Sequence, residues 1–102
     1  MVILVTRVTV HPDRRDECLD FCQRWLEDTR HSPGCLSYRL YEESGRTDDL
    51  LFLGEWKSMA DLDRHFRTPH FATLVQRLPG FLSAPSDVKI HDIFETRTIL
   101  GN

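Results

Sequence analysis

Apolar and polar residues alternate along the chain in a pattern that predicts four strands. Residues 2–10 are apolar and β-branched with no helix breaker among them, which is typical of a strand. Residues 35–42 and 50–57 flank a polar turn at 44–49, so we expect these two segments to form a hairpin. The last expected strand spans residues 88–96.

Helical patterns fill the intervals between these strands. In the first interval, apolar residues recur at three- and four-residue steps and predict a helix with one apolar face. That face is made of Cys18, Leu19, Phe21, Cys22, Trp25 and Leu26. A second helix is expected to begin at Ser58, with Asp61 placed as in a capping box. A third is expected over 69–78, because Thr68 suits the N-cap position and proline suits the first helical position.

The order of these elements predicts the fold class. A β-α-β-β-α-β order is that of the ferredoxin-like, α+β arrangement, in which helices cover one face of a four-stranded antiparallel sheet. The chain has 102 residues and shows no linker, repeat or low-complexity segment. We therefore expect residues 1–102 to form a single domain.

Both faces of the expected sheet carry apolar side chains. On the first strand, one face consists of Val2, Leu4, Val8 and Val10, and the other carries Ile3 and Val5. The second strand is expected to place Leu36, Tyr38 and Leu40 on one face. Because helices can cover only one side of the sheet, a monomer would expose a large apolar patch. We therefore expect a homodimer that buries sheet against sheet, with the last strand or the tail reaching across.

Composition narrows the partners and the compartment. The formal net charge is −3 and no basic stripe is present, so nucleic acid is not expected to bind. No apolar run approaches the ~18 residues of a membrane span, and the N-terminus lacks the pattern of a signal peptide. Cys18, Cys22 and Cys35 form no CxxC pair and read as free thiols of a cytoplasmic protein. Without metal-ligand spacing or a glycine-rich phosphate loop, we expect no cofactor and no metal.

Two histidines flank the expected junction between the second and third helices. His65 should end one helix and His70 should open the next. Histidine exchanges protons near neutral pH, and His65 follows Leu62 by three residues, which turns its ring towards the interior or the rim. Each histidine is therefore a candidate acid or base, and the alternative for each is a structural role at a helix end.

Four segments, taken in order, carry a resemblance to a known family. They are Val8-Thr9-Val10-His11-Pro12, Ser32-Pro33-Gly34-Cys35-Leu36-Ser37-Tyr38, Phe52-Leu53-Gly54-Glu55-Trp56-Lys57-Ser58 and His65-Phe66-Arg67-Thr68-Pro69-His70-Phe71. Over residues 2–95 the chain resembles the antibiotic-biosynthesis monooxygenase (ABM) domain family. The resemblance implies a dimeric α/β barrel with a pocket in each subunit, between the sheet and the helices.

The same resemblance leaves the activity open, because the family includes cofactor-free oxygenases of anthrones and quinols, haem-degrading enzymes and a signal-processing isomerase. Haem-degrading members carry an Asn on the first strand, a Trp on the helix after the third strand and a His on the following helix. In this chain Thr6 and His65 stand at the first two places, and residues 72–75 contain no histidine. The resemblance therefore points away from haem degradation and towards the quinol-oxygenase and isomerase branches.

We therefore expect a cofactor-independent monooxygenase that oxidises a quinol-like or polycyclic phenolic or anthrone substrate with O₂. His65 is the first choice as the acid or base and His70 the second. The expected substrate contacts are Trp56, Tyr38, Thr6, Phe66, Phe71 and Arg39. Ordinary packing, or a surface ion pair for Arg39, is the alternative role of these residues.

Two other classes of function stay open. One is a small-carbonyl isomerase or another proton-transfer enzyme that uses His65, and the other is a non-catalytic dimeric binding or stress module. An aromatic-lined cavity would favour the oxygenase, and a small polar cavity with basic residues would favour the isomerase. A collapsed cavity with His65 facing solvent would favour the non-catalytic module.

Overall fold

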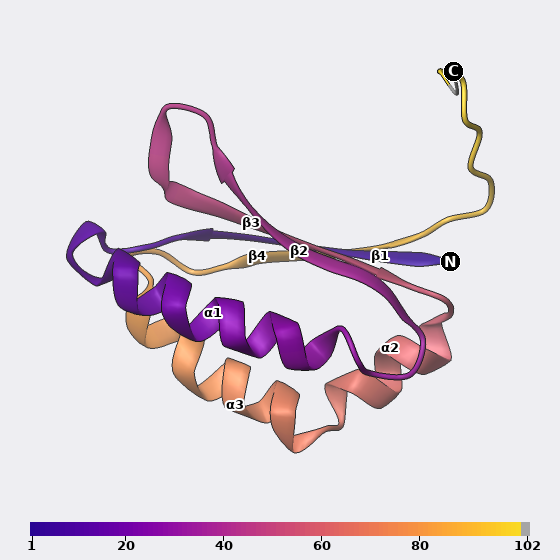
Figure 1. Cartoon of the computed structure of the whole chain (residues 1–102), viewed down its shortest axis with the longest axis horizontal. Helices are drawn as coiled ribbons and strands as arrows, with labels where there is room; N and C mark the ends of the chain where they lie inside the picture. The colour runs from indigo at the N-terminus through magenta and orange to yellow at the C-terminus, as the bar shows by residue number, and fades with distance from the viewer. Residues whose placement is uncertain (101–102) are drawn as a thin grey trace.

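Four antiparallel strands form one sheet, and the helices pack on one of its faces (Figure 1). The computed structural model describes residues 1–100. Its strands are β1 (Val2–Thr9), β2 (Cys35–Glu43), β3 (Arg46–Trp56) and β4 (Asp87–Asp92), and its α-helices are α1 (Arg15–Thr29), α2 (Met59–Phe66) and α3 (Pro69–Arg77). Short 3-10 turns, Pro12–Arg14 and Leu78–Phe81, precede α1 and follow α3. The sheet order β2-β3-β1-β4 confirms the predicted α+β, ferredoxin-like fold.

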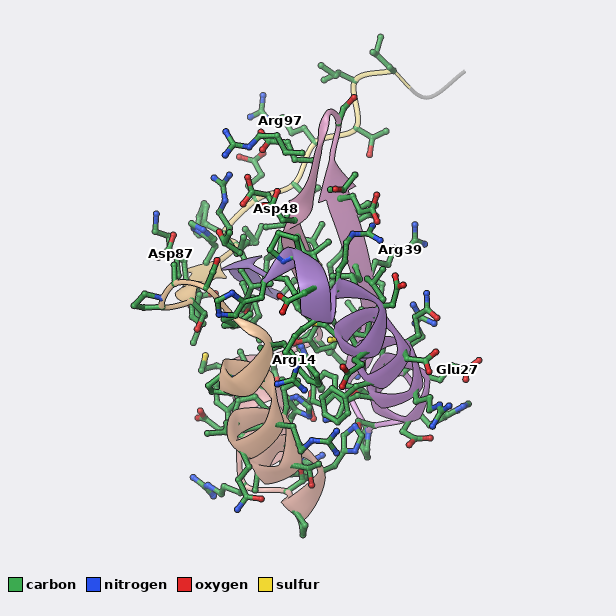
Figure 2. The ribbon with its side chains drawn as sticks, turned by 90° about the vertical axis from the view of Figure 1, so that its left-hand side faces the viewer. Arg14, Glu27, Arg39, Asp48, Asp87 and Arg97 are labelled. Atoms are coloured by element: carbon green, nitrogen blue, oxygen red, sulfur yellow. The ribbon has the colours of Figure 1, made fainter. Side chains whose placement is uncertain are left out.

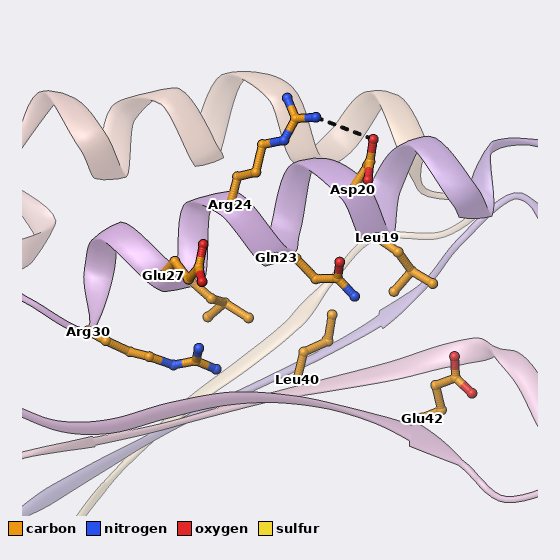
Figure 3. A pocket seen from close by; sticks show the side chains of 9 residues that line it. Leu19, Asp20, Gln23, Arg24, Glu27, Arg30, Leu40 and Glu42 are labelled. Atoms are coloured by element: carbon orange, nitrogen blue, oxygen red, sulfur yellow. Dashed lines mark ion pairs between the residues drawn. The ribbon is translucent and has the colours of Figure 1, made fainter.

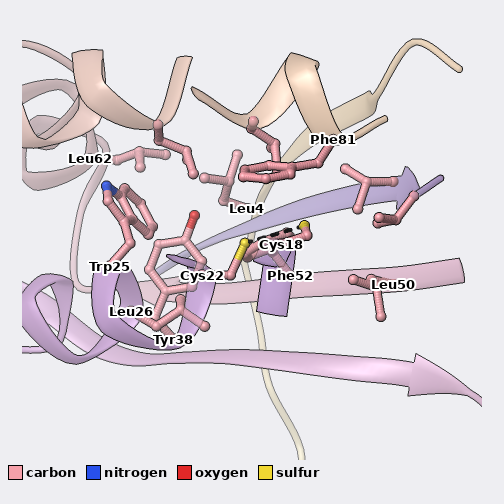
Figure 4. Packing of buried hydrophobic residues seen from close by; sticks show 14 of the residues in the cluster. Leu4, Cys18, Cys22, Trp25, Leu26, Tyr38, Leu50, Phe52, Leu62 and Phe81 are labelled. Carbon is pink, nitrogen blue, oxygen red and sulfur yellow. Dashed lines mark hydrogen bonds between the residues drawn. The ribbon is translucent and has the colours of Figure 1, made fainter. Parts of the chain in front are cut away.

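The core lies between this sheet and the helices, as the apolar pattern requires. Strand β1 runs in the middle of the sheet, and its Leu4 lies opposite Gly54 of β3 and Ile90 of β4. Figure 4 shows the inward side chains of the strands meeting Trp25 and Leu26 of α1. Burial of this apolar surface is the main stabilising contribution to the fold.

The starts of α2 and α3 confirm the predicted caps. The Ser58 hydroxyl accepts the backbone N–H of Asp61 at 3.1 Å and donates to its carboxylate at 2.8 Å. The Thr68 hydroxyl accepts the backbone N–H of Phe71 at 3.1 Å. These bonds satisfy amides that a helix start otherwise leaves free, and they fix the elbow between the two helices.

Strand β3 begins at Arg46, whereas the polar residues that open it predicted a start at residue 50. Residues 46–49 were expected in a turn, but they pair with neighbouring strands, and the tight turn is restricted to residues 44–45. Thr9 donates its hydroxyl to the Asp49 carboxylate at 3.0 Å, and Arg46 forms an ion pair with Asp49 at 2.8 Å. Gly45 has a φ of 81°, which suits a residue without a side chain. One bond between strands and one within β3 thus satisfy polar side chains that would otherwise favour a turn.

Two other expectations about the strands are wrong. A bulge between Cys35 and Ser37 leaves Leu36 exposed, so it does not share the inward face of Tyr38 and Leu40. Strand β4 ends at Asp92 instead of residue 96. The chain beyond β4 leaves the sheet and extends away from the body (Figure 1).

The second face of the sheet has no covering element among residues 1–100. Ile3, Val5, Leu51 and Leu53 form its half-buried apolar centre, where Val5 pairs directly with Leu53. The neighbouring side chain of Arg39 projects outward from β2 (Figure 2). The tail adds Phe94, Ile99 and Leu100, whose side chains are almost fully exposed. An uncovered apolar surface of this kind is typical of an interaction site.

Candidate functional site

A cavity of about 170 Å³ lies between the sheet and the pair α2–α3. Four of the expected substrate contacts line it, namely Thr6, Tyr38, Phe66 and Phe71. Its remaining wall is made mainly of aliphatic side chains from α3 and the neighbouring strands, and no charged residue lines it. Such a cavity suits a neutral, flat, apolar molecule.

Thr6 is a polar residue on the otherwise apolar inward face of β1. It pairs with Phe52 of β3 on one side and with Val88 of β4 on the other, in the row that includes the buried Leu4 and Val8. Its hydroxyl therefore stands on the floor of the cavity. Together with the hydroxyl of Tyr38, it gives the sheet side of the cavity two groups that both donate and accept hydrogen bonds.

Gly54 makes room for the aromatic side chains next to the cavity. Tyr38 pairs with Gly54 across β2 and β3, and a Cβ atom at position 54 would stand 3.3 Å from the Tyr38 ring and 3.1 Å from Nε1 of Trp56. Both distances are tighter than ordinary contacts, so glycine permits this close approach. Tyr38 is buried, and that burial raises the pKa of its phenol, which keeps the hydroxyl protonated.

His65 lies directly behind the cavity wall, in a box of aromatic rings. Its side chain is 2% exposed, and its ring centroid is 4.6 Å from that of Trp56, 5.2 Å from Phe71 and 5.6 Å from Trp25. Tyr38 is 6.2 Å away. The predicted inward orientation is confirmed, and the ring of His65 packs against Trp56, Tyr38 and Phe71, three of the expected substrate contacts. His65 and Trp56 form a second layer behind the side chains that line the cavity.

The polar atoms of this second layer have no partners in the part of the chain that the structure describes. Both ring nitrogens of His65 and Nε1 of Trp56 are buried without a hydrogen bond. Each such atom costs about 1–3 kcal/mol of stability. Burial, followed by the influence of His70, lowers the pKa of His65 to about 4. At neutral pH the ring is therefore uncharged, with one nitrogen free to accept a proton and the other carrying one.

His70 occupies a different environment. Its ring stacks on Trp25 with centroids 4.7 Å apart, and its Nε2 lies 2.7 Å from the Thr29 hydroxyl and 3.0 Å from the Trp25 carbonyl. Nε2 is thus engaged in holding the start of α3 against α1. The structure does not bring His70 to the cavity wall.

Arg39 is the other candidate that the structure leaves apart. Side chains alternate along β2, so the inward position of Tyr38 places Arg39 on the opposite face of the sheet, beside Leu53.

Trp25 packs against His65 and so belongs to the site, although the sequence indicated only a core position for it. The sequence signal for this inward position was the spacing of Trp25, which places it on the same apolar helical face as Cys18 and Cys22.

Two further hollows lie away from these candidates. Figure 3 shows a groove between α1 and β2, where Leu40 lies below a charged rim that includes an Arg24–Asp20 ion pair at 3.6 Å. The other lies under the β2–β3 hairpin, on the second face of the sheet. Both mix charges of opposite sign with apolar side chains, and neither gathers the aromatic residues found around His65.

Residues 1–100 contain no group of three or more His, Cys, Asp or Glu side chains that could hold a metal ion. The Cys18 and Cys22 sulfurs lie 3.9 Å apart in the core, as free thiols. None of the helices in this range has the length and apolar character needed to cross a bilayer.

Comparison with known proteins places these features in a family context. The family model for antibiotic biosynthesis monooxygenase matches residues 1–77. The chain is 36% identical to the uncharacterised protein sll1783 of Synechocystis over 98 residues, which cover 96% of this chain and 67% of that protein. It is 33% identical to YcnE of Bacillus subtilis, named as a candidate monooxygenase, over 86% of this chain and 93% of YcnE.

Solved structures show the same architecture. The structure of Rv0793 from Mycobacterium tuberculosis superposes with a TM-score of 0.86 at 25% sequence identity. The superposition covers 95% of this chain and 98% of Rv0793. The likeness therefore extends over the sheet and the helices.

Proposed function

The chain belongs to the antibiotic biosynthesis monooxygenase family, and we propose that it is a cofactor-independent monooxygenase that oxidises a quinol-like or polycyclic phenolic or anthrone substrate with O₂. One observation carries the proposal. An uncharged, buried histidine without a hydrogen-bond partner among residues 1–100 stands beside an aromatic-lined cavity that contains no charged side chain. The free nitrogen of this neutral ring is placed to accept a phenolic proton, and the substrate anion that forms beside it then raises the pKa of the ring.

The proposed reaction needs no electron donor other than the substrate. His65 accepts a proton from a quinol hydroxyl, and the resulting delocalised anion passes one electron to O₂. The two radicals combine to form a carbon–oxygen bond, and the peroxide takes up a proton. The ring carbon that carries the hydroperoxide then loses its own proton, and the electron pair of this C–H bond forms a C=O bond as the O–O bond breaks. The carbonyl tautomerises to a hydroxyl on the ring. One oxygen atom remains on the ring as a hydroxyl, the other leaves as water, and the quinol becomes a hydroxyquinone.

The remaining residues hold and orient this anion. Trp56 can donate its indole N–H, and the protonated Tyr38 can donate its hydroxyl, so both can stabilise negative charge on the substrate oxygen. Thr6 offers a further donor from the floor of the cavity. The rings of Phe66 and Phe71 pack at a tilt of 54°, with their centroids 4.8 Å apart, and form the wall between the cavity and His65. We propose that the Phe71 ring, which lies between the cavity and His65, turns aside to admit a substrate to the His65 nitrogens.

The size of the cavity favours the smaller substrates in this class. A volume of about 170 Å³ lies well below the ~300–1,000 Å³ of pockets for drug-sized ligands. One or two fused rings fit this volume better than the ring system of an anthrone. The absence of basic residues from its lining argues against a small-carbonyl isomerase, and the burial of His65 argues against a non-catalytic module.

We further propose that residues 1–102 act as a single domain and that two copies associate through the second face of the sheet. The apolar centre formed by Ile3, Val5, Leu51 and Leu53 would be covered in such a dimer. The exposed apolar tail would then lie on the partner subunit. Association would remove apolar surface from water without disturbing the cavity on the other face.

Oxygen consumption with a panel of one-, two- and three-ring quinols and anthrones tests the function. We expect turnover with two-ring quinols and a loss of about 10²–10⁴-fold in His65→Ala. His11→Ala changes an exposed histidine in the loop between β1 and α1, so it is the matched control and should retain full activity. An unchanged rate of oxygen consumption in His65→Ala would refute the proposal. The absence of any turnover by the wild type would also refute it.

A further inference from the structure

Helices α1 and α3 are joined by a closed set of polar contacts involving three residues. The Thr29 hydroxyl donates to the Trp25 carbonyl at 2.7 Å, and the Trp25 indole N–H donates to the His70 carbonyl at 2.8 Å. His70 Nε2 lies 3.0 Å from the Trp25 carbonyl, which can only accept, so this nitrogen must carry the proton. The same N–H is shared with the Thr29 hydroxyl oxygen at 2.7 Å. Here we call these three residues the clasp.

Trp25, one of the three residues of the clasp, packs against the ring of His65. Trp25 stacks flat on His70, with 2° between the ring planes, and meets His65 at an angle of 61°. The indole is therefore located between the two histidines. Its orientation is fixed on one side by its own hydrogen bond and by the stacked His70 ring.

His65 lacks the usual means of orientation for a histidine that handles protons. Such a ring is ordinarily held by a hydrogen bond to one of its nitrogens, and neither nitrogen of His65 has one among residues 1–100. Packing against neighbouring rings must then fix its direction. Trp56 and Phe71 also touch it, but neither ring makes a hydrogen bond to another element, whereas Trp25 is bonded to α3.

We propose that the clasp of Trp25, Thr29 and His70 positions His65, and that Trp25 is the residue through which it acts. This inference rests on the proposed function for its catalytic consequence, but not for its structural one. His70 is on this account a positioning residue and not a second acid or base. The clasp holds the ring of His65 in one orientation against Tyr38 and Phe71, which line the cavity.

Selective isotope labelling of histidine gives a readout that does not depend on any substrate. In ¹⁵N–¹H spectra of the full chain, His65 should show one ring orientation and one tautomer. Thr29→Val removes only the hydroxyl and His70→Leu removes both the donor and the stacked ring, so each should broaden or split the His65 signals. His70→Gln, which restores an N–H donor, should recover the single set. Thr73→Val is the matched control, because that hydroxyl donates to the Pro69 carbonyl on the same helix, outside the clasp.

Oxygen consumption with 1,4-naphthoquinol then tests the catalytic consequence. Misplacement of His65 should lower kcat by roughly 10- to 100-fold in Thr29→Val and His70→Leu, with KM changed less than about twofold. His70→Gln should recover most of kcat. If His70→Leu does not fold, Thr29→Val decides the question. His65 signals that are unchanged in the folded variants would overturn the clasp, whatever the kinetics. Altered signals without turnover by any protein, the wild type included, would uphold the clasp and remove the proposed function.

Discussion

The ring centroids of Trp56 and His65 lie 4.6 Å apart, and none of the three nitrogens in these two side chains has a hydrogen-bond partner among residues 1–100. A core usually excludes such atoms or pairs them, because each one left unpaired costs stability. Here they occur together and beside a cavity. The simplest physical account is that stability has been given up to keep these groups free for a bound molecule.

His65→Leu should therefore make the protein more stable while removing its activity. The substitution replaces two unpaired polar atoms with an apolar side chain of similar volume, and we expect a gain of about 1 kcal/mol in the free energy of unfolding. His70→Leu is the matched comparison and should lose about 1–2 kcal/mol, because it breaks the bonds to Thr29 and Trp25. Urea unfolding measures both. Equal destabilisation by the two variants would contradict this account.

Acidification should destabilise the protein through His65. Its pKa is about 4 in the folded chain and about 6.5 when unfolded, so the unfolded state takes up the proton first as the pH falls. The contribution is fully present above pH ~6.5 and is lost progressively down to pH ~4, for a total of roughly 3 kcal/mol. Unfolding curves at pH 7 and pH 4.5 measure it. His65→Leu should lack this part of the decline, and parallel declines in the two proteins would rule it out.

Gly54→Ala should disturb the packing of Tyr38 and Trp56 next to the cavity. The new methyl group would press on Trp56 Nε1 and on the Tyr38 ring, both held in a packed core, and we expect a loss of about 1–3 kcal/mol with reduced turnover. Gly80→Ala is the control, since its nearest neighbour would be Arg14 Nη1 at an ordinary 3.8 Å. Thermal unfolding and oxygen consumption check both variants. A fully active and stable Gly54→Ala protein would mean that the close approach has no role.

The sequence anticipated much of this site, and its misses have physical causes. The inward direction of His65 followed from its spacing to Leu62, and the caps at Ser58 and Thr68 followed from local chemistry alone. The separate position of Arg39 depends on the register of β2. The exposure of Leu36 results from a bulge next to that register, and no apolar pattern encodes it. The engagement of His70 depends on contacts between residues 41 and 45 positions apart, which a local pattern does not contain.

The last prediction concerns the second face of the sheet. If two copies associate there, light scattering should give about twice the 12.0 kDa mass of the chain at micromolar concentration. Leu53→Asp places a charge at the apolar centre of this face, and burying an unpaired charge is costly, so it should yield monomers. Met59→Asp, a similar change at the exposed start of α2, should leave the dimer intact. A wild-type monomer would remove the sheet-to-sheet arrangement, and a dimer of unchanged stability in Leu53→Asp would place the interface elsewhere.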